Sequence, residues 1–225
     1  MQRHEVIQRI GQAAPGIRSA PGTTPHPTAP RVFDASMPGQ RGDHDLNPGL
    51  APDRSLTAAA VLVPLIDRPD GMTVLLTKRT DHLHDHAGQV SFPGGRLDPE
   101  DRDAAAAALR EAKEEVGLDP DRVDLVGRLD TYVTRTGFEV VPWVGLIAPP
   151  IALAPDPFEV AEVFEVPLAF FLDAASRRTE SRVWQGKERF FYVYPWPGYY
   201  IWGATAGMLS NLAEILRAET RDAVG

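Results

Sequence analysis

Apolar residues along this chain recur at two spacings, one typical of buried strands and the other typical of helices. Residues 57–66 form a nearly unbroken apolar run, which predicts a buried strand. The turn-forming residues 67–71 follow, and residues 72–77 form a second apolar run, so these two strands are expected to make a hairpin. Later runs at residues 123–129 and 139–147 predict two further strands.

Residues 103–116 carry the strongest helical pattern. Asp101 or Asp103 can cap this helix, a run of alanines favours it, and Gly117 can end it. Five residues form the apolar stripe that must face a core: Ala105, Ala108, Leu109, Ala112 and Val116. Because the stripe occupies one side of the helix, another side is free to present polar groups.

The remaining elements are short and of both types. They are a brief strand at 90–92, a short helix at 167–172, a hairpin formed by 182–184 and 189–194, and a closing helix at 204–218. Strands with intervening helices predict a single α+β domain. We expect an αβα sandwich, in which helices flank a mixed central sheet, over residues 56–220.

The first 55 residues differ from the rest of the chain. They are rich in proline and glycine and show little apolar periodicity. Residues 1–55 are therefore expected to be a proline-rich, poorly ordered segment, and a docking role is the alternative. Val6, Ile7 and Ile10 allow a short amphipathic turn near the start.

Composition narrows the functional classes. The net charge of −8 disfavours a general nucleic-acid binder, which normally has a basic face. No stretch approaches the ~20 consecutive apolar residues that cross a bilayer, so no membrane span is expected. The absence of cysteine excludes disulfides and thiolate metal sites, and a cytoplasmic location is the default expectation. The negative net charge remains compatible with a small anionic substrate, since a bound cation makes the local electrostatic potential positive.

The end of the predicted helix carries the candidate chemistry. Glu111 lies three residues before Glu114 and four residues before Glu115. Helical geometry is therefore expected to bring the three side chains together. Arg110 can pair with only part of their charge, and a hard divalent cation such as Mg²⁺ or Mn²⁺ suits the remainder. The alternative is a solvated acidic face. The helix dipole disfavours anions at this end, which argues against that alternative.

Residues 95–118 resemble the Nudix box, in which a glycine and a spaced acid precede Arg-Glu-apolar-x-Glu-Glu-x-Gly-apolar. The last nine positions match throughout. The spaced acid is Asp101 in place of glutamate, and one extra residue separates it from Arg110. The resemblance implies a Nudix fold and a metal-dependent hydrolase of diphosphate bonds, in which a water attacks a phosphorus.

The same resemblance implies roles for individual residues. Glu111, Glu114 and Glu115 would be ligands of Mg²⁺ or Mn²⁺, with the Gly95 carbonyl joining them, and Arg110 would orient Glu114. A further catalytic glutamate commonly comes from outside the box. Glu159 and Glu162 are the candidates, and Glu162 is our choice. For both, an ordinary exposed segment is the alternative interpretation.

Residues 75–95 also resemble a signature of the coenzyme A pyrophosphatase branch. Arg79, His84 and Phe92 would then contact the substrate. This chain has Thr80 where the branch has serine or alanine, and His84 where it has arginine. The implied reaction converts coenzyme A or its derivatives to 3′,5′-ADP and 4′-phosphopantetheine, or its acylated form.

Two alternatives stay open at this point. The first is a Nudix pyrophosphatase for another nucleoside diphosphate derivative, such as ADP-ribose or NADH. The second is a non-catalytic Nudix binding module, against which the intact glutamates argue. The expected partner is a small-molecule diphosphate, and neither nucleic acid nor a membrane is an expected partner. The chain is expected to be a monomer or homodimer.

Overall fold

The computed structural model describes the chain except for residues 14–32, 35–38, 51, 53–54, 83–86 and 219–225. Four α-helices are present in the described part: α1 (Arg3–Ala13), α2 (Ala104–Val116), α3 (Leu168–Leu172) and α4 (Gly203–Arg217). Short 3-10 helices span Pro120–Arg122 and Ala174–Ser176.

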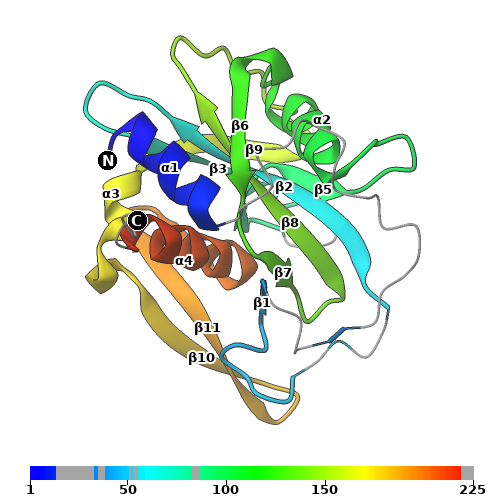
Figure 1. The fold of residues 1–225 in the computed structure, drawn as a ribbon. Coiled ribbons are helices and arrows are strands. Elements are labelled where there is room, and N and C mark those ends of the chain that lie inside the picture. The colour runs from blue at the N-terminus through cyan, green and yellow to red at the C-terminus, as the bar shows by residue number, and fades with distance from the viewer. Residues whose placement is uncertain (14–32, 35–38, 51, 53–54, 83–86, 219–225) are drawn as a thin grey trace, which may run out of the picture.

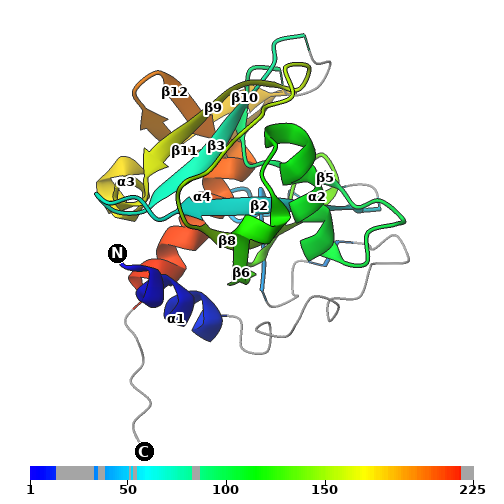
Figure 2. The same cartoon turned by 90° about the horizontal axis from the view of Figure 1, so that it is seen from above.

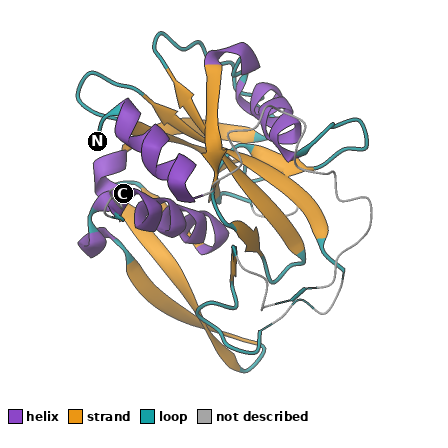
Figure 3. Ribbon diagram, viewed as in Figure 1, coloured by secondary structure: helices purple, strands orange, loops and turns teal. Residues whose placement is uncertain are grey.

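The strands form two sheets (Figure 3). The large sheet contains β1 (Gln40–Gly42), β2 (Thr57–Ile66), β3 (Thr73–Arg79), β4 (Val90–Ser91), β5 (Gly94–Arg96), β6 (Val123–Arg128), β7 (Thr131–Val133), β8 (Phe138–Ile147) and β9 (Val160–Pro167). The small sheet contains β10 (Arg178–Trp184), β11 (Lys187–Trp196) and β12 (Tyr199–Trp202). Runs of three to five strands are separated by single α-helices along the described part of the chain, as expected of an α+β domain.

Two long strands form the centre of the large sheet. β2 and β8 pair in parallel along their whole length, from Thr57 opposite Phe138 to Ile66 opposite Ile147. β3 pairs antiparallel with the end of β2, and β6 and β7 pair antiparallel with β8. The sheet is therefore mixed, and the predicted hairpin of residues 57–66 and 72–77 is confirmed.

Helices cover both faces of this sheet, so the αβα arrangement is confirmed (Figures 1 and 2). Adjacent residues of β2 point to opposite faces. Leu62 joins a core cluster with the alanines of α2, whereas Val63 joins a second cluster with residues of α1 and α4. The small sheet packs on the α4 side, through β11 and β12.

Both ends of α2 have the expected caps. The Asp103 carboxylate accepts a hydrogen bond of 2.8 Å from the Ala106 N–H, so Asp103 and not Asp101 is the N-cap. Gly117 ends the helix at a φ of 68°, and its N–H donates to the Lys113 carbonyl at 3.0 Å. The predicted stripe is buried except for Leu109, which is half-buried.

Sequence patterns did not predict β9 and β12. β9 is paired with β3 only, and it carries charged residues such as Glu162 and Glu165 on an otherwise apolar run. β12 follows Gly198, which takes a positive φ of 85°, and its four residues are too few for a recognisable alternation. The hairpin of β10 and β11 turns at Gln185 and Gly186, as expected.

The N-terminal region is more structured than expected in two places. Val6 and Ile10, four residues apart on α1, are fully buried, and Ile10 packs closely on Gly127, where a side chain would clash with it. Further along, β1 pairs in parallel with β7, and the Tyr132 hydroxyl donates to Asp43 at 2.9 Å. The rest of the expected poorly ordered segment lies largely outside the described residues.

No helix in the described part of the chain is both long enough and apolar enough to cross a membrane.

Candidate active site

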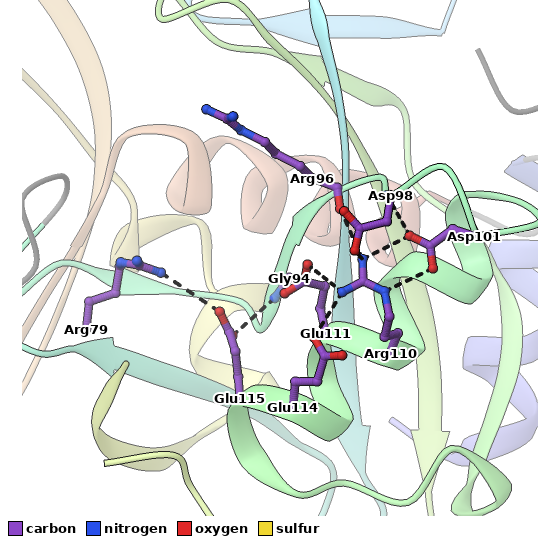
Figure 4. A network of polar contacts seen from close by, with 9 residues as sticks. All are labelled: Arg79, Gly94, Arg96, Asp98, Asp101, Arg110, Glu111, Glu114 and Glu115. Carbon is purple, nitrogen blue, oxygen red and sulfur yellow. Dashed lines mark hydrogen bonds and ion pairs between the residues drawn. The ribbon is translucent and has the colours of Figure 1, made fainter. Parts of the chain in front are cut away.

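Arg110 is the centre of a polar network beside α2 (Figure 4). Its guanidinium donates two hydrogen bonds to Asp101, from Nε at 3.0 Å and from Nη2 at 2.9 Å. Nη1 donates to Glu111 at 3.0 Å and to Glu114 at 2.9 Å. Nη2 also donates to the backbone carbonyl of Arg96 at 3.2 Å. Arg110 thus orients two carboxylates and ties them to the loop that precedes the helix.

Gly95 provides the space that the Glu111 carboxylate occupies. It lies in β5 opposite Ala60 of β2. A Cβ at Gly95 would lie 2.5 Å from Oε1 of Glu111, so a larger residue would displace this carboxylate. The pKa of Glu111 is raised, because the effect of burial exceeds the opposing effect of the hydrogen bond from Arg110.

Glu115 is the most deeply buried carboxylate of the helix, with an exposed fraction of 6%. It accepts a hydrogen bond from the Gly94 N–H at 3.2 Å, and Arg79 Nη1 lies 3.9 Å from its Oε1. Burial raises the pKa of Glu115 to about 8, and the negative charges of Glu111 and Glu159 add to the rise. Figure 4 shows the Glu115 carboxylate between Arg79 and Gly94.

Glu159 lies in the loop before β9, whose backbone is bonded to α2 and to the end of β3. The Asp156 N–H donates to the backbone carbonyl of Glu115 at 2.9 Å, and the Thr80 N–H donates to the carbonyl of Glu159 at 3.0 Å. These two bonds fix the loop against α2 and the end of β3. The charge of Glu159 contributes to the raised pKa of both Glu111 and Glu115.

Glu162 is not brought to the cluster. It lies opposite Lys78 in the pairing of β9 with β3, and its carboxylate accepts a hydrogen bond from the Tyr199 hydroxyl. Phe164, two residues further along, stacks on the Tyr199 ring with 3.6 Å between centroids. Both side chains therefore lie on the face of β9 that is turned away from α2, because residues two apart share a strand face.

The three residues expected to contact substrate have different locations. Arg79 lies beside Glu115, and its Nε is buried with no hydrogen-bond partner among the described residues. Phe92 is 2% exposed and belongs to the core cluster on the α4 side, so a direct substrate contact is not supported. His84 lies outside the described residues.

The expected convergence of three glutamates is only partly observed. The Glu114 side chain is 59% exposed and is directed to Arg110. Within the described ranges, no group of three His, Asp or Glu side chains is placed to hold a metal ion. The reason is that Arg110 attracts Glu111 and Glu114, whereas Glu115 is turned toward Gly94.

The residues of the cluster nevertheless suit a hard divalent cation. Glu111 and Glu115 are one helical turn apart, burial raises the pKa of both, and Glu159 adds a third negative charge nearby. Buried carboxylates are costly unless a positive charge offsets them. Oxygen is also the ligand that Mg²⁺ and similar ions prefer. Fold and site thus define an α+β domain with a carboxylate centre suited to a divalent cation.

Comparison with known proteins assigns the family. A sequence model described as the NUDIX domain matches residues 56–186. The chain therefore belongs to the Nudix family, whose hydrolases act on pyrophosphate bonds and generally use divalent metal ions. It is an enzyme, and the predicted Nudix fold is confirmed by this match together with the mixed sheet and its helices.

Curated relatives carry the same family name. The chain is 40% identical over 167 residues to Nudix hydrolase 15, mitochondrial, of Arabidopsis thaliana, covering 70% of this chain and 58% of that protein. It is 45% identical over 163 residues to the uncharacterized Nudix hydrolase NudL of Cronobacter sakazakii, covering 69% and 80%. A C. elegans Ap4A hydrolase structure is 22% identical, with a TM-score of 0.42 over 49% of this chain and 80% of that chain.

Proposed function

We propose that this enzyme hydrolyses the diphosphate bond of coenzyme A or its derivatives, with Mg²⁺ or Mn²⁺ as cofactor. The observation that carries the proposal is the buried Glu115 carboxylate, 3.9 Å from the Arg79 guanidinium. Glu115 can bind a metal cation, and the positively charged Arg79 beside it can bind a phosphate. This pairing matches the charges of a metal-bound diphosphate.

The preference for coenzyme A rests on the segment that carries the sequence resemblance. Residues 75–95 run from β3 to β5 and contribute three groups to the cluster. Arg79 approaches Glu115, the Gly94 N–H donates to Glu115, and Gly95 leaves room for Glu111. These contacts support the proposal that the segment influences substrate choice.

Each side chain has a distinct role in the proposed reaction. Arg79 binds a diphosphate oxygen through its guanidinium, since 27% of its side chain is exposed. Glu111, Glu114 and Glu115 would hold the divalent cation, which would supply positive charge to the diphosphate oxygens. Arg110 positions Glu111 and Glu114. The Gly95 carbonyl stays a proposed further ligand.

Glu159 is our candidate for the general base, in place of Glu162, because it lies near the other carboxylates. Its carboxylate accepts a proton from the attacking water as the water oxygen bonds to phosphorus. The bridging phosphorus–oxygen bond breaks, which gives 3′,5′-ADP and 4′-phosphopantetheine from coenzyme A. With an acyl-coenzyme A the second product keeps its acyl group.

A substrate panel tests the proposal. Coenzyme A, acyl-coenzyme A, dephospho-coenzyme A, ADP-ribose and NADH are compared at equal concentration with Mg²⁺ or Mn²⁺. We expect the highest kcat/KM for one of the first two compounds and no turnover after chelation. Faster hydrolysis of ADP-ribose or NADH would overturn the substrate assignment and favour the alternative nucleoside diphosphate derivatives.

Single substitutions separate the catalytic role from mere binding. Glu114→Gln and Glu115→Gln are each expected to lower kcat by at least about 10²-fold, since a lost metal ligand removes transition-state charge stabilisation. Full turnover by either variant would refute the assigned role. The cytoplasmic location and the monomeric or homodimeric state stay predictions.

A further inference from the structure

We propose that Phe158, backed by His82, is a stacking platform for the planar base of a nucleotide whose diphosphate binds at Arg79. This inference rests on the proposed function, and it specifies a substrate subsite that the carboxylate cluster does not provide. The ligand class is a nucleoside 5′-diphosphate derivative.

Phe158 stands apart from the other exposed hydrophobic side chains. Among the described residues, five large hydrophobics are strongly exposed: Phe158, Val183, Trp184, Phe190 and Tyr200. The last four belong to the small sheet. Phe158 is 65% exposed and is the immediate sequence neighbour of Glu159.

The backbone around Phe158 is firmly held. Its N–H donates to the Asp156 carboxylate at 2.8 Å, and its carbonyl accepts a hydrogen bond from the Thr80 hydroxyl at 2.8 Å. Thr80 directly follows Arg79, and Asp156 is bonded to the backbone of Glu115. The Phe158 ring is thus carried by a segment anchored to both sides of the carboxylate cluster.

His82 supports one side of the ring. The two ring centroids lie 4.9 Å apart with planes inclined by 56°. Most of the Phe158 surface remains open to solvent, and an exposed aromatic ring on a fixed segment can gain burial when a flat partner covers it. A base stacks on such a ring with little regard to its identity, because every base has a π-face.

The positive charge of Arg79 near Phe158 favours a nucleotide as the ligand over a purely apolar group. Arg79 lies in the pairing of β3 with β9 opposite Val160, two residues beyond Phe158. The Arg79 side chain is 27% exposed, and its guanidinium suits a phosphate oxygen. A ligand that joins a phosphate to a planar base satisfies both groups at once.

The test measures binding of AMP and of ribose 5-phosphate, which lacks a base, by calorimetry with Mg²⁺ present. In Phe158→Ala the Kd for AMP is expected to rise about tenfold, which corresponds to about 1.4 kcal/mol. The Kd for ribose 5-phosphate should stay within about twofold of its wild-type value, because this ligand has no base to stack on Phe158. Phe158→Trp should retain AMP affinity, and AMP but not ribose 5-phosphate should quench its additional fluorescence.

Phe190→Ala is the matched control, because it removes another exposed phenylalanine from β11 of the small sheet. It should leave both affinities unchanged. An unchanged AMP affinity in Phe158→Ala, or an equal loss for ribose 5-phosphate, would overturn the platform. Preferential loss of 4′-phosphopantetheine affinity would overturn it too and place the pantetheine arm at Phe158.

Activity distinguishes failure of this inference from failure of the proposed function. If the wild-type enzyme hydrolyses coenzyme A and Phe158→Ala has an unchanged KM and AMP affinity, only the platform is wrong. If the wild-type enzyme hydrolyses ADP-ribose in preference to coenzyme A and Phe158→Ala weakens AMP binding, the platform stands and the substrate assignment is wrong.

Discussion

Arg110 and Asp101 are joined by two parallel hydrogen bonds of 3.0 and 2.9 Å, although nine residues separate them. Asp101 is only 8% exposed, and its carboxylate also accepts a hydrogen bond from the Asp98 N–H at 2.8 Å. The loop before α2 is therefore folded around the same arginine that holds Glu111 and Glu114. Through Arg110, a loop residue influences where the helix carboxylates point.

The planar fork of Arg110 predicts a strong effect of a charge-preserving change. Arg110→Lys keeps the positive charge but cannot form the paired bonds to Asp101 and still reach both glutamates. We expect kcat to fall by about 10- to 100-fold with a smaller change in KM. Steady-state kinetics measure this, with Arg102→Lys as control because Arg102 is exposed and adjacent to the loop. Equal activity of the two variants would contradict the role of Arg110.

The two candidate glutamates near β9 predict opposite outcomes. Glu159 lies near the carboxylate cluster, whereas Glu162 is bonded to Tyr199 on the other face. Glu159→Gln should lower kcat by about 10²-fold or more, as expected for loss of a general base. Glu162→Gln should leave kcat within about threefold of wild type, since it removes no group from the site. A larger loss in Glu162→Gln would restore the sequence-based choice.

Gly95 predicts a loss of activity without loss of fold. In Gly95→Ala the new Cβ would meet the end of the flexible Glu111 side chain, 2.5 Å away. The carboxylate can move aside, so the melting temperature should change little, but it then leaves its position beside Arg110. We expect a fall in kcat of at least about tenfold, because misplacement by about 1 Å has large effects on catalysis. Wild-type kcat in a well-folded variant would argue against a precise position for Glu111.

Glu115 predicts an unusual pH dependence of stability. Its pKa is raised to about 8 from an ordinary 4.5, so the folded protein binds this proton more tightly than the unfolded chain. The contribution of this group to stability is therefore fully present below pH 4.5 and is lost as the pH rises toward 8. In chelator, Glu115→Gln should raise the free energy of unfolding at pH 7.5 by on the order of 2 kcal/mol and have little effect at pH 4.

Denaturant unfolding at several pH values in chelator measures this difference. Addition of Mg²⁺ or Mn²⁺ at pH 7.5 should stabilise the wild-type protein more than Glu115→Gln, because a cation bound to the native state favours folding. Parallel stability curves for the two proteins across this pH range would show that Glu115 is not perturbed.

Long, strongly patterned elements were predictable from sequence. The strand at 57–66 and the helix that begins after Asp103 agree closely with β2 and α2, because their buried faces and caps are encoded within the elements themselves. β9 was missed, because it is stabilised by pairing with β3 and by the stacking of Phe164 on Tyr199, contacts that no local pattern reveals.

The candidate site shows the same distinction. Helical spacing placed Glu111 and Glu115 on one side of α2, but it could not show that Arg110 directs Glu114 outward. The choice of Glu162 over Glu159 depended on the side-chain direction within a strand that the sequence did not predict. Phe92 was a predicted substrate contact on the resemblance alone, yet its ring is buried in the core.

The first and last helices of the described part, α1 and α4, touch one another. α1 packs on β6 and α4, and the Arg9 guanidinium donates to the backbone carbonyl of Leu216. During synthesis, α1 leaves the ribosome before α4 has been made, because the whole sheet lies between them in the sequence. The surface of Val6 and Ile10 therefore cannot be fully covered until α4 has emerged, so docking of α1 on α4 is expected to follow formation of the sheet.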